Sequence, residues 1–500
     1  MSLDTALDQL AERVGIYSEY RDLSGTLHVT PVETKRALLD AMGFDPNDAA
    51  GELRRIEGEE HRRRLPRTLV TRSDEPARID VPGLDVDWRF APDPRTSLGQ
   101  MSGRSSDGVI DLPELPVGLH LVIIGLEHTL IVAAPPTAPD LASRGLSTPR
   151  WGVTTALYGL TSDRNFGLGT FDDLAVAAEG LAVHGADFLG INPVHALGVA
   201  SDTISPYSPT HRGFLNTDHI APAGGWDDPA AQALRATSHV QYDASRTLTL
   251  GRLRDEFDQV MADQEQVTAF AAYRQEAGHA LEDFAVFEVL SQIHGADWRG
   301  WPDDLQRPTS PTVRTFAVEN ARDVSFHAFL QWRADTQLGG AQQRALDAGM
   351  ALGLYVDLAI GVRPDGAEVW AEPNAFARGV SLGTPPDQFN SQGQVWGLAP
   401  MSPIGLAREL YRPFVDTVRT VFRHAGLARI DHVLGFMRCF WVPESETYRG
   451  APGAYVRYPW EILLAITKVE ATHAGCLVIG EDLGVLPEGL RDRLSEARLY

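Results

Sequence analysis

Two short apolar strands that each end in a carboxylate constrain the fold of this chain more than any other feature. Residues 427–431 read Leu-Ala-Arg-Ile-Asp, and residues 476–481, about fifty positions later, read Cys-Leu-Val-Ile-Gly-Glu. Parallel barrels place their working groups at the C-terminal ends of consecutive strands, where two carboxyls can flank one sugar linkage. The pattern therefore predicts an α/β protein with a glycosidase-type site at its strand ends.

Strand and helix patterns alternate from Trp151 onward, which is typical of βαβ units. Residues 225–300 are strongly helical and acidic and interrupt this alternation, so we interpret part of them as an insertion in a barrel loop. We predict a (β/α)8 TIM-type barrel over 146–500, incomplete at its C-terminus, with strands one to five only. The expected strands are 153–159, 187–192, 351–360, 427–431 and 476–481, and the expected helices include 171–184 and 326–338.

The first 145 residues have a different hydrophobic pattern from the rest of the chain. Apolar residues recur at helical spacing over 3–15 and 31–43, which predicts a helical unit over 1–65. Short alternating runs separated by Pro, Gly and Asp predict a β-sandwich-like domain over 66–145. In that domain only Trp88 and Phe90 suggest a ring platform for a glucan.

Composition excludes several classes of partner. The chain has 44 Lys and Arg against 67 Asp and Glu, a formal net charge of −23. Such a surface repels phosphate, so we expect no nucleic-acid or anionic-membrane partner. The N-terminus has early acids, and no stretch of about 18 apolar residues appears, which excludes a signal peptide and a membrane span. These observations favour a cytoplasmic protein.

Cofactor and metal sites are not indicated. Cys439 and Cys476 stand in apolar, strand-like runs and are interpreted as buried free thiols. The histidines show no ligand-like pairing such as H-x-x-x-H, which argues against a metal. The glycines of residues 165–171 do not form the Gly-x-Gly-x-x-Gly pattern, so a nucleotide site has no support.

The two strand-end acids suggest different chemical roles. Arg429 and Asp431 stand two residues apart and would face one side, so the guanidinium would keep Asp431 ionised, as a nucleophile requires. The alternative is a plain ion pair that caps the strand. The apolar run before Glu481 would desolvate its carboxyl and raise its pKa, as a general acid requires, although Glu481 could equally be an acid at a strand–loop junction. Asp482 competes for the acid role, but alternation sends it to the other face, where a loop or helix-capping role is more natural.

Several other residues are candidates for substrate contact. Asp357 ends a third strand and could orient substrate or hydrogen-bond within the barrel mouth. Tyr207 and Trp396 stand on Pro-rich and Gly-rich loops, where flat rings suit the apolar faces of glucose, although such rings also pack loops. His432 could face substrate or pack.

Together these motifs resemble the 4-α-glucanotransferases known as amylomaltase or disproportionating enzyme, glycoside hydrolase family 77. Six motifs spread over most of the chain show the resemblance and stand in the order found in the family. They are residues 157–169 (LYGLTSDRNFGLG), 205–209 (SPYSP), 357–370 (DLAIGVRPDGAEVW), 392–397 (QGQVWG), 429–432 (RIDH) and 480–484 (GEDLG).

The resemblance implies a role for each matched residue. It implies that Asp431 is the nucleophile, that Glu481 is the general acid/base, and that Arg429 positions the nucleophile. It also implies N-terminal domains like those of some bacterial members. The substrates would be maltooligosaccharides, amylose or glycogen-derived glucans, with no cofactor. It implies that Trp396 and Tyr207 contribute to glucan-binding subsites, and Tyr158, Asp357, Gln394 and His432 are further candidates for substrate binding.

Two features depart from the family pattern. Val395 and residues 399–401 (Ala-Pro-Met) replace residues that are commonly polar or aromatic in the family. Family members also have a His-Asp motif on a later strand, and this sequence stops at Tyr500 before such a strand. Because a sheet cut after five of eight strands has an open edge, we expect the 500 residues to be a truncated version of a longer protein. On their own, these 500 residues would fold poorly and would have negligible catalytic turnover.

The sequence thus predicts a retaining α-1,4-glucan transferase that works through a covalent glucosyl-enzyme intermediate. An α-glucan hydrolase of similar architecture is the alternative within the enzyme class. A non-catalytic glucan-binding protein is the alternative from a different class.

Overall fold

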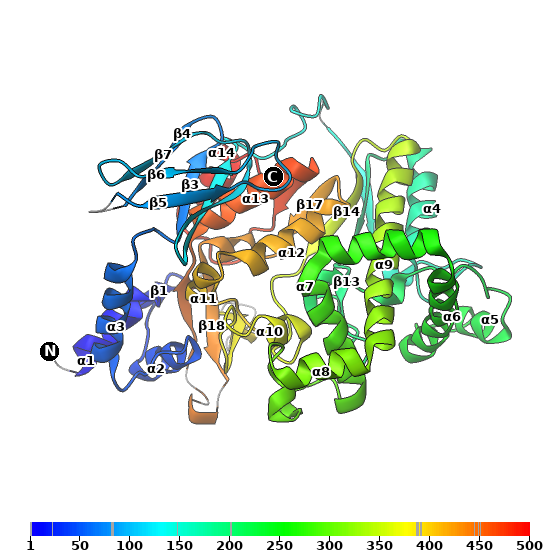
Figure 1. Cartoon of the computed structure of the whole chain (residues 1–500). Helices are drawn as coiled ribbons and strands as arrows, with labels where there is room; N and C mark the ends of the chain where they lie inside the picture. Colours follow the sequence, from blue (N-terminus) through cyan, green and yellow to red (C-terminus); the bar gives the residue numbers. More distant parts are fainter. Residues whose placement is uncertain are drawn as a thin grey trace. The chain divides into compact units, whose positions relative to one another are not determined.

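The computed structural model describes residues 3–22, 24–81, 85–147, 149–200, 203–386, 390, 393–444, 446–448, 450 and 452–500. The chain forms two compact units (Figure 1). Unit 1 contains Met1–Asp140, Asn374–Arg419 and Ile430–Tyr500, and unit 2 contains Leu141–Pro373 and Thr420–Arg429. The chain passes from unit 2 back into unit 1 inside a single strand, between Arg429 and Ile430.

Unit 1 combines small helices, a sheet-rich region and two later groups of elements. Its elements, with 3-10 helices labelled η, are α1 Leu3–Arg13, β1 Glu19–Arg21, β2 Leu27–Val29, α2 Val32–Ala41, α3 Ala49–Arg62, β3 Thr68–Arg72, β4 Pro76–Asp80, β5 Asp87–Ala91, β6 Met101–Arg104, β7 Val109–Glu114, β8 Gly118–Ile124, β9 Glu127–Ala134, β15 Val380–Thr384, β16 Gln394–Val395, α11 Pro403–Arg408, η5 Val433–Phe436, β18 Arg438–Pro443, η6 Glu446–Tyr448, β19 Ala454–Arg457, α13 Trp460–Ala474, β20 Leu477–Gly480 and α14 Leu490–Glu496.

The predicted N-terminal helices are confirmed as α1 and α2, and a third helix, α3, follows them. In α2 the residue before the first turn is Pro31, whose missing N–H costs nothing there. The α2 side chains of Leu38 and Leu39 are fully buried. Asp48 caps α3 by accepting a hydrogen bond from the Gly51 N–H at 3.0 Å.

The strands predicted between residues 66 and 135 are also confirmed. Five of them form a sheet in the order β3-β9-β8-β5-β6, and β4 pairs with β7 in a second, antiparallel sheet. In β8 the side chains alternate between buried and partly buried, which is the period of a strand with one face on a core.

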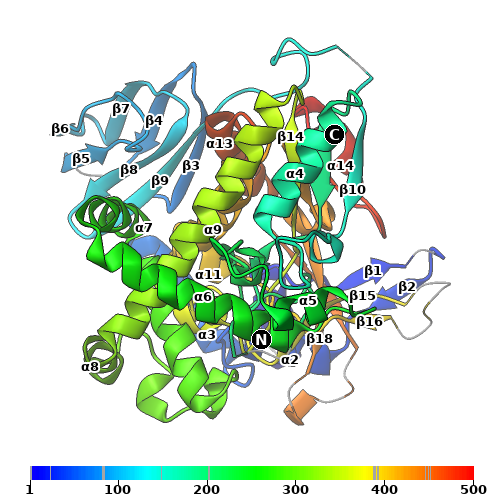
Figure 2. The ribbon, with the colours of Figure 1, turned by 90° about the vertical axis from the view of Figure 1, so that its right-hand side faces the viewer.

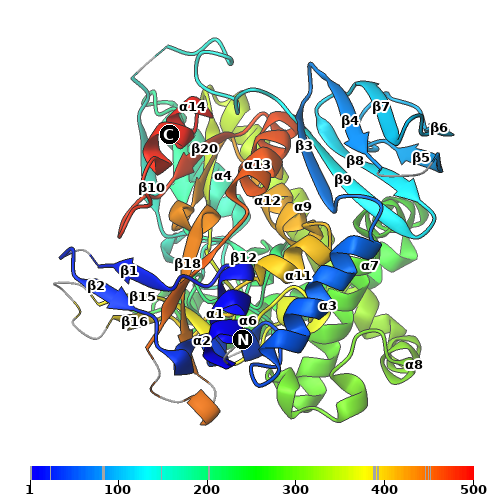
Figure 3. The ribbon, with the colours of Figure 1, turned by 90° about the vertical axis from the view of Figure 1, so that its left-hand side faces the viewer.

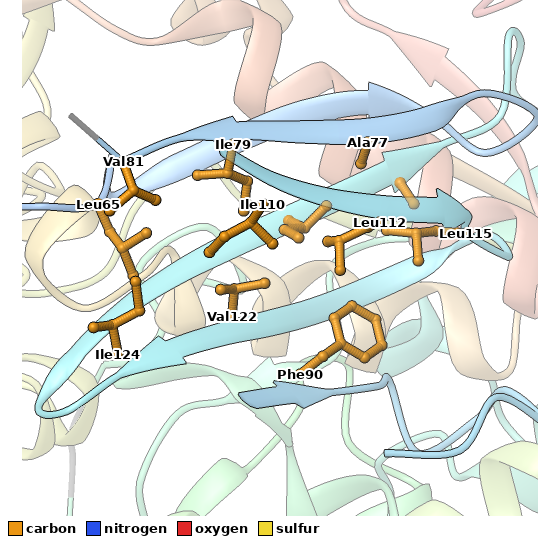
Figure 4. Packing of buried hydrophobic residues seen from close by; sticks show 12 residues of the cluster. Leu65, Ala77, Ile79, Val81, Phe90, Ile110, Leu112, Leu115, Val122 and Ile124 are labelled. Carbon is orange, nitrogen blue, oxygen red and sulfur yellow. The ribbon is translucent and has the colours of Figure 1, made fainter. Parts of the chain in front are cut away.

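A cluster of twelve buried residues joins these two sheets. Figure 4 shows Ile79 and Ile110 on one side of the cluster and Val122 and Phe90 on the other. Phe90 is only 1% exposed, and Trp88 packs against the same cluster. The suggestion that these two rings form a glucan platform is therefore wrong for Phe90, because alternation along β5 turns its ring into the core.

Helix α13 packs against β9 and β8 in the same unit (Figure 3). The buried carboxylate of Glu470 on this helix accepts hydrogen bonds from Arg95 at 2.6 and 2.8 Å and from Arg419 at 3.0 and 3.1 Å. Burial raises the pKa of Glu470, but the two guanidiniums outweigh it and hold the pKa below the ordinary value. Removing one partner would leave a buried charge unpaired.

Unit 2 contains the parallel strands and most of the long helices. Its elements are β10 Gly152–Thr155, η1 Leu157–Gly159, α4 Phe171–Ala182, β11 Phe188–Ile191, β12 His195–Ala196, β13 His211–Leu215, η2 Thr217–His219, α5 Pro229–Arg235, α6 Tyr242–Ala262, α7 Gln264–His294, η3 Trp298–Gly300, η4 Asp303–Leu305, α8 Pro311–Glu319, α9 Ala321–Asp347, β14 Gly353–Leu358 and α10 Ala367–Ala371. Helix α12 (Arg412–Arg423) and strand β17 (Leu427–Ile430) begin in one unit and end in the other.

The predicted alternation of strands and helices is confirmed in unit 2. Strands β10, β11 and β14 pair in parallel in that order, and β17 lies next to β14, where the Gly426 N–H donates to Leu354 O at 3.1 Å. Helix α4 opens with a capping box between Thr170 and Asp173. Helix α4 packs beside α9 (Figure 2).

Residues 225–300 are helical, as predicted, and form α5, α6, α7 and η3. Helix α7 is interrupted at Gly278, whose φ of 61° and ψ of −149° suit only glycine. In the part of the chain that the structure describes, none of the helices has both the length and the apolar character needed to cross a membrane. Cys439 and Cys476 are buried free thiols.

Replacing Phe90 by Ala tests the packing between the two sheets of unit 1. Because the ring is fully buried, its removal should lower the free energy of unfolding by about 3–5 kcal/mol. Urea unfolding followed by circular dichroism measures this change. The control is Leu126→Ala, because Leu126 is 96% exposed and its loss should change the free energy by less than about 0.5 kcal/mol. Equal effects of the two substitutions would contradict the packing described here.

Candidate active site

The two acids singled out by the sequence both follow strand ends. Asp431 comes directly after β17 and Glu481 directly after β20. In unit 1 the Glu481 N–H donates to Ile430 O at 3.0 Å, and the Val433 N–H donates to Glu481 O at 2.9 Å. Because these backbone bonds flank the position of Asp431, the two acids lie at the ends of neighbouring strands.

Backbone donors orient the carboxylate of Glu481. Its Oε2 accepts from the His432 N–H and its Oε1 from the Leu483 N–H, each at 2.9 Å. Glu481 is partly exposed. The apolar strand ends at Gly480 and the side chain lies in the loop beyond it, and the general-acid role of Glu481 stays a prediction.

His432 connects Glu481 to the Trp396 loop. Its backbone is left-handed, with φ 53° and ψ 54°, and its ring meets Trp396 edge-to-face with centroids 5.3 Å apart. The Trp396 indole N–H donates to Gln394 Oε1 at 3.0 Å. Three of the predicted substrate-binding residues therefore lie together beside Glu481. Gln392, at the start of the 392–397 motif, is outside the residues that the structure describes.

The imidazole of His432 is neutral at physiological pH. Burial lowers its pKa to about 4, although the Glu481 carboxylate acts in the opposite direction. A neutral ring can accept or donate one hydrogen bond but adds no positive charge. His432 is thus suited to hydrogen bonding with a hydroxyl rather than to stabilising an anion.

Asp357 lies at the centre of a second cluster, within unit 2. Its carboxylate accepts two hydrogen bonds from Arg429 Nη1, at 2.7 and 2.8 Å, and one from the Tyr207 hydroxyl at 2.8 Å. Asp357 is buried and Tyr207 is 42% exposed. Within unit 2 the Arg429 guanidinium pairs with Asp357, because β14 and β17 are neighbours in the sheet. Its expected position beside Asp431 stays a prediction.

A buried ion pair supports the backbone after Asp357. Arg212 donates to Glu368 through its backbone N–H and its Nη2, each at 2.8 Å, and through Nη1 to Ile360 O at 2.9 Å. The Ala359 N–H donates to Nε2 of His195, whose pKa burial lowers to about 3. The sequence analysis missed these residues, because a charged side chain that will pair in the interior has no local pattern.

Tyr158, the remaining predicted substrate-binding residue, lies in η1 and is 36% exposed. Packing explains the glycine at position 169, since a Cβ there would meet Leu157 O at 2.0 Å. Asp482, the alternative acid, pairs with Arg491, with Oδ2 and Nε 2.6 Å apart.

Comparison with known proteins identifies the family of this chain. A family model described as 4-alpha-glucanotransferase matches residues 155–500, which include all the candidate residues above. This chain belongs to the 4-alpha-glucanotransferase family. The prediction of a glycosyltransferase-type enzyme that transfers α-1,4-glucan segments is thereby confirmed.

Relatives in the 4-alpha-glucanotransferase family are similar along the whole chain. A 4-alpha-glucanotransferase of Mycobacterium tuberculosis is 35% identical and covers 98% of this chain, which spans 74% of that relative. A 4-alpha-glucanotransferase of Haemophilus influenzae is 31% identical and covers 100% of this chain, which spans 75% of it.

Solved structures show the same α/β fold. The amylomaltase of Corynebacterium glutamicum superposes with a TM-score of 0.81 at 28% identity, and the match covers 99% of this chain and 74% of the other. An amylomaltase of Streptococcus agalactiae, solved with acarbose, has a TM-score of 0.60 at 20% identity, with 70% and 72% coverage. The second likeness supports the fold alone.

The segment before Tyr207 is anchored by a buried acid, Glu288. The Glu288 Oε2 accepts a hydrogen bond from the Val199 N–H at 2.8 Å. A second bond holds the same segment, since Arg363 Nη1 donates to Thr203 Oγ1 at 2.9 Å. Burial raises the pKa of Glu288 to about 7. Glu288 is therefore largely protonated in the folded protein below neutral pH.

Replacing Glu288 by Gln tests this protonation. Since the folded pKa is about 7 and the ordinary value is 4.5, the contribution of Glu288 to stability is complete below pH 4.5 and is lost as the pH rises through 7. At pH 8 we expect Glu288→Gln to be more stable than the wild type by about 3 kcal/mol, and the difference should nearly vanish at about pH 4.

Chemical unfolding at the two pH values measures the difference, and Glu276→Gln, at an exposed position on the same helix, is the control. A wild-type protein as stable at pH 8 as Glu288→Gln would rule out the raised pKa.

Proposed function

We propose that this chain is a retaining 4-α-glucanotransferase whose covalent chemistry is performed by Asp431 and Glu481. The observation that supports the proposal most is the placement of these acids directly after neighbouring strand ends, within two of the family's motifs. Retaining glycosidases place a nucleophile and an acid/base on either side of the anomeric carbon. A pair of acids delivered by adjacent strands meets that requirement.

The reaction has two displacement steps. Glu481 protonates the leaving glycosidic oxygen while Asp431 attacks the anomeric carbon, which gives a glucosyl-enzyme ester and a shortened glucan. Glu481, now ionised, removes the proton of an acceptor 4-hydroxyl, which attacks the ester and regenerates Asp431. The two backbone N–H donors on Glu481 support this role, since they hold both of its oxygens in place.

Arg429 serves as the residue that positions the nucleophile. It stands two residues before Asp431, and its guanidinium is held by both oxygens of Asp357. A permanent cation with a fixed direction favours the ionised form of a nearby carboxylate. Asp357 in turn aligns Tyr207 through its hydroxyl.

The aromatic side chains provide the glucan subsites. Tyr158, Tyr207 and Trp396 are at least partly exposed and offer ring faces to glucose units, while Gln394 and His432 offer hydrogen-bonding groups. The substrates are maltooligosaccharides, amylose or glycogen-derived glucans, without a cofactor. Transfer exceeds hydrolysis if an acceptor on these rings excludes water from the ester.

We further propose that the parallel strands belong to a TIM-type (β/α)8 barrel spanning 146–500, after a helical unit over 1–65 and a β-sandwich-like domain over 66–145. The order β10-β11-β14-β17 supports the barrel, since sequential strands are neighbours in it. The two buried free thiols support a reducing, cytoplasmic location.

Replacing Asp431 by Asn tests the nucleophile. Without a carboxylate the ester cannot form, so disproportionation of maltotriose should fall by at least about a thousandfold. Chromatography of the product chain lengths measures it, because transfer yields chains longer than the substrate and hydrolysis yields only shorter ones.

Glu481→Gln should also lose transfer, whereas the neighbouring variant Asp482→Asn is the matched control and should keep most of the activity. Substantial transfer by Asp431→Asn would refute the assignment of the nucleophile. Products that are only shorter than maltotriose would indicate a hydrolase. Calorimetric binding of maltoheptaose with no change in chain length would indicate a non-catalytic glucan-binding protein.

A further inference from the structure

Unit 1 contains a cavity of about 380 Å³ that none of the candidate active-site residues lines. Its wall comes from α1 and α3 near the N-terminus and from the segments around α11 and the end of β19. Small-molecule sites have volumes of about 300–1,000 Å³ and combine apolar walls with a few polar groups. The cavity is therefore large enough for a monosaccharide derivative.

Positive charge is concentrated at this cavity. The guanidinium of Arg67 lines it and has no hydrogen bond or ion pair with any residue that the structure describes. Partial burial lowers the pKa of Arg67, and the neighbouring cations Arg63 and Arg408 act in the same direction, against the smaller opposing effect of Glu59 and Glu60. In a chain with a net charge of −23, such a group of arginines points to an anion as the missing partner.

Carboxylates in the wall compensate only part of this charge. Glu59 lies 3.6 Å from Arg408 but is bonded more closely to Arg55, at 2.8 Å. Glu60 pairs with Arg13. The lining thus contains four arginines and two glutamates, so a dianion would balance it.

Tyr411 contributes a polar group to the cavity. The residue is only 3% exposed and lines the cavity, and within the described part of the chain its hydroxyl has no hydrogen-bond partner. The hydroxyl oxygen is not itself buried, so it is open to a hydrogen bond with a ligand. Tyr411 and the preceding Leu410 also have left-handed backbones, with φ of 61° and 50°, which is strained for such side chains and is found most often at functional sites.

The remaining wall is apolar. Phe44, Ile56 and Pro403 line the cavity, and Phe44 is only 3% exposed. Apolar and aromatic surfaces pack against the C–H face of a sugar ring, while Tyr411 and the free acceptor positions of Glu59 suit its hydroxyls.

We propose that this cavity binds a phosphorylated hexose, with the phosphate at Arg67 and Arg408, a sugar hydroxyl at Tyr411 and the ring against Phe44. The site is separate from the residues assigned to catalysis, so the inference does not depend on those assignments.

Isothermal titration calorimetry of the full chain with glucose 6-phosphate tests the proposal. The wild type should bind one equivalent, and Arg67→Ala should weaken binding at least about tenfold because it removes the unpaired cation. Arg67→Lys should recover part of the loss, and Tyr411→Phe should weaken binding by about threefold. Arg104→Ala is the matched control and should bind as the wild type does, since Arg104 is exposed and lies outside the cavity.

Four results would overturn the proposal: no saturable binding by the wild type, unchanged binding by Arg67→Ala in a folded protein, equally tight binding of unphosphorylated glucose, or equally tight binding of inorganic phosphate, which would mean an adventitious ion only. The variant Asp431→Asn should bind glucose 6-phosphate as tightly as the wild type. Weaker binding by that variant would be a fifth result against the proposal, because it would locate the ligand in the active site. Thermal unfolding of each variant checks that it is folded.

Discussion

The backbone hydrogen bonds between the ends of β17 and β20 determine the rest of the candidate chemistry. Glu481 donates to Ile430 O and accepts from the Val433 N–H, so the segment that contains Asp431 is held between two backbone contacts with Glu481. Backbone bonds of this kind do not depend on side-chain rotamers. The relative position of the two acids is therefore a property of the sheet, and the side chains need only small adjustments to meet a substrate.

Charged groups in the interior complete the placement of the functional residues. Arg212 with Glu368, and Arg429 with Asp357, pair beside the end of β14, and Arg95 pairs with Glu470 under the sheets of unit 1. Desolvation largely cancels the attraction in such pairs, so they add little net stability. These pairs instead favour one folded arrangement over others, because the donors of each guanidinium are satisfied only in that arrangement.

Periodicity explains which expectations were met. Helices α2 and α4 and strands β11, β14, β17 and β20 all lie where local patterns predict them, with ends shifted by a few residues. One expectation about a side-chain environment was wrong, because Phe90 lies in a core. Two further environments were not anticipated, since Arg429 pairs with Asp357 and Glu481 lies partly exposed in the loop after its strand. Each depends on contacts between segments far apart in the chain, which no short-range pattern encodes.

The sequence by itself determined the α/β class, the family and the identity of the two strand-end acids, because strand periodicity and motif order are properties of the linear chain. Tertiary structure alone decided which donors hold Glu481, which carboxylate receives Arg429, and that the side chains of Arg67 and Tyr411 line one cavity. The physical reason is that hydrogen bonding and burial are decided by the neighbours a residue acquires on folding, and these come from distant parts of the sequence.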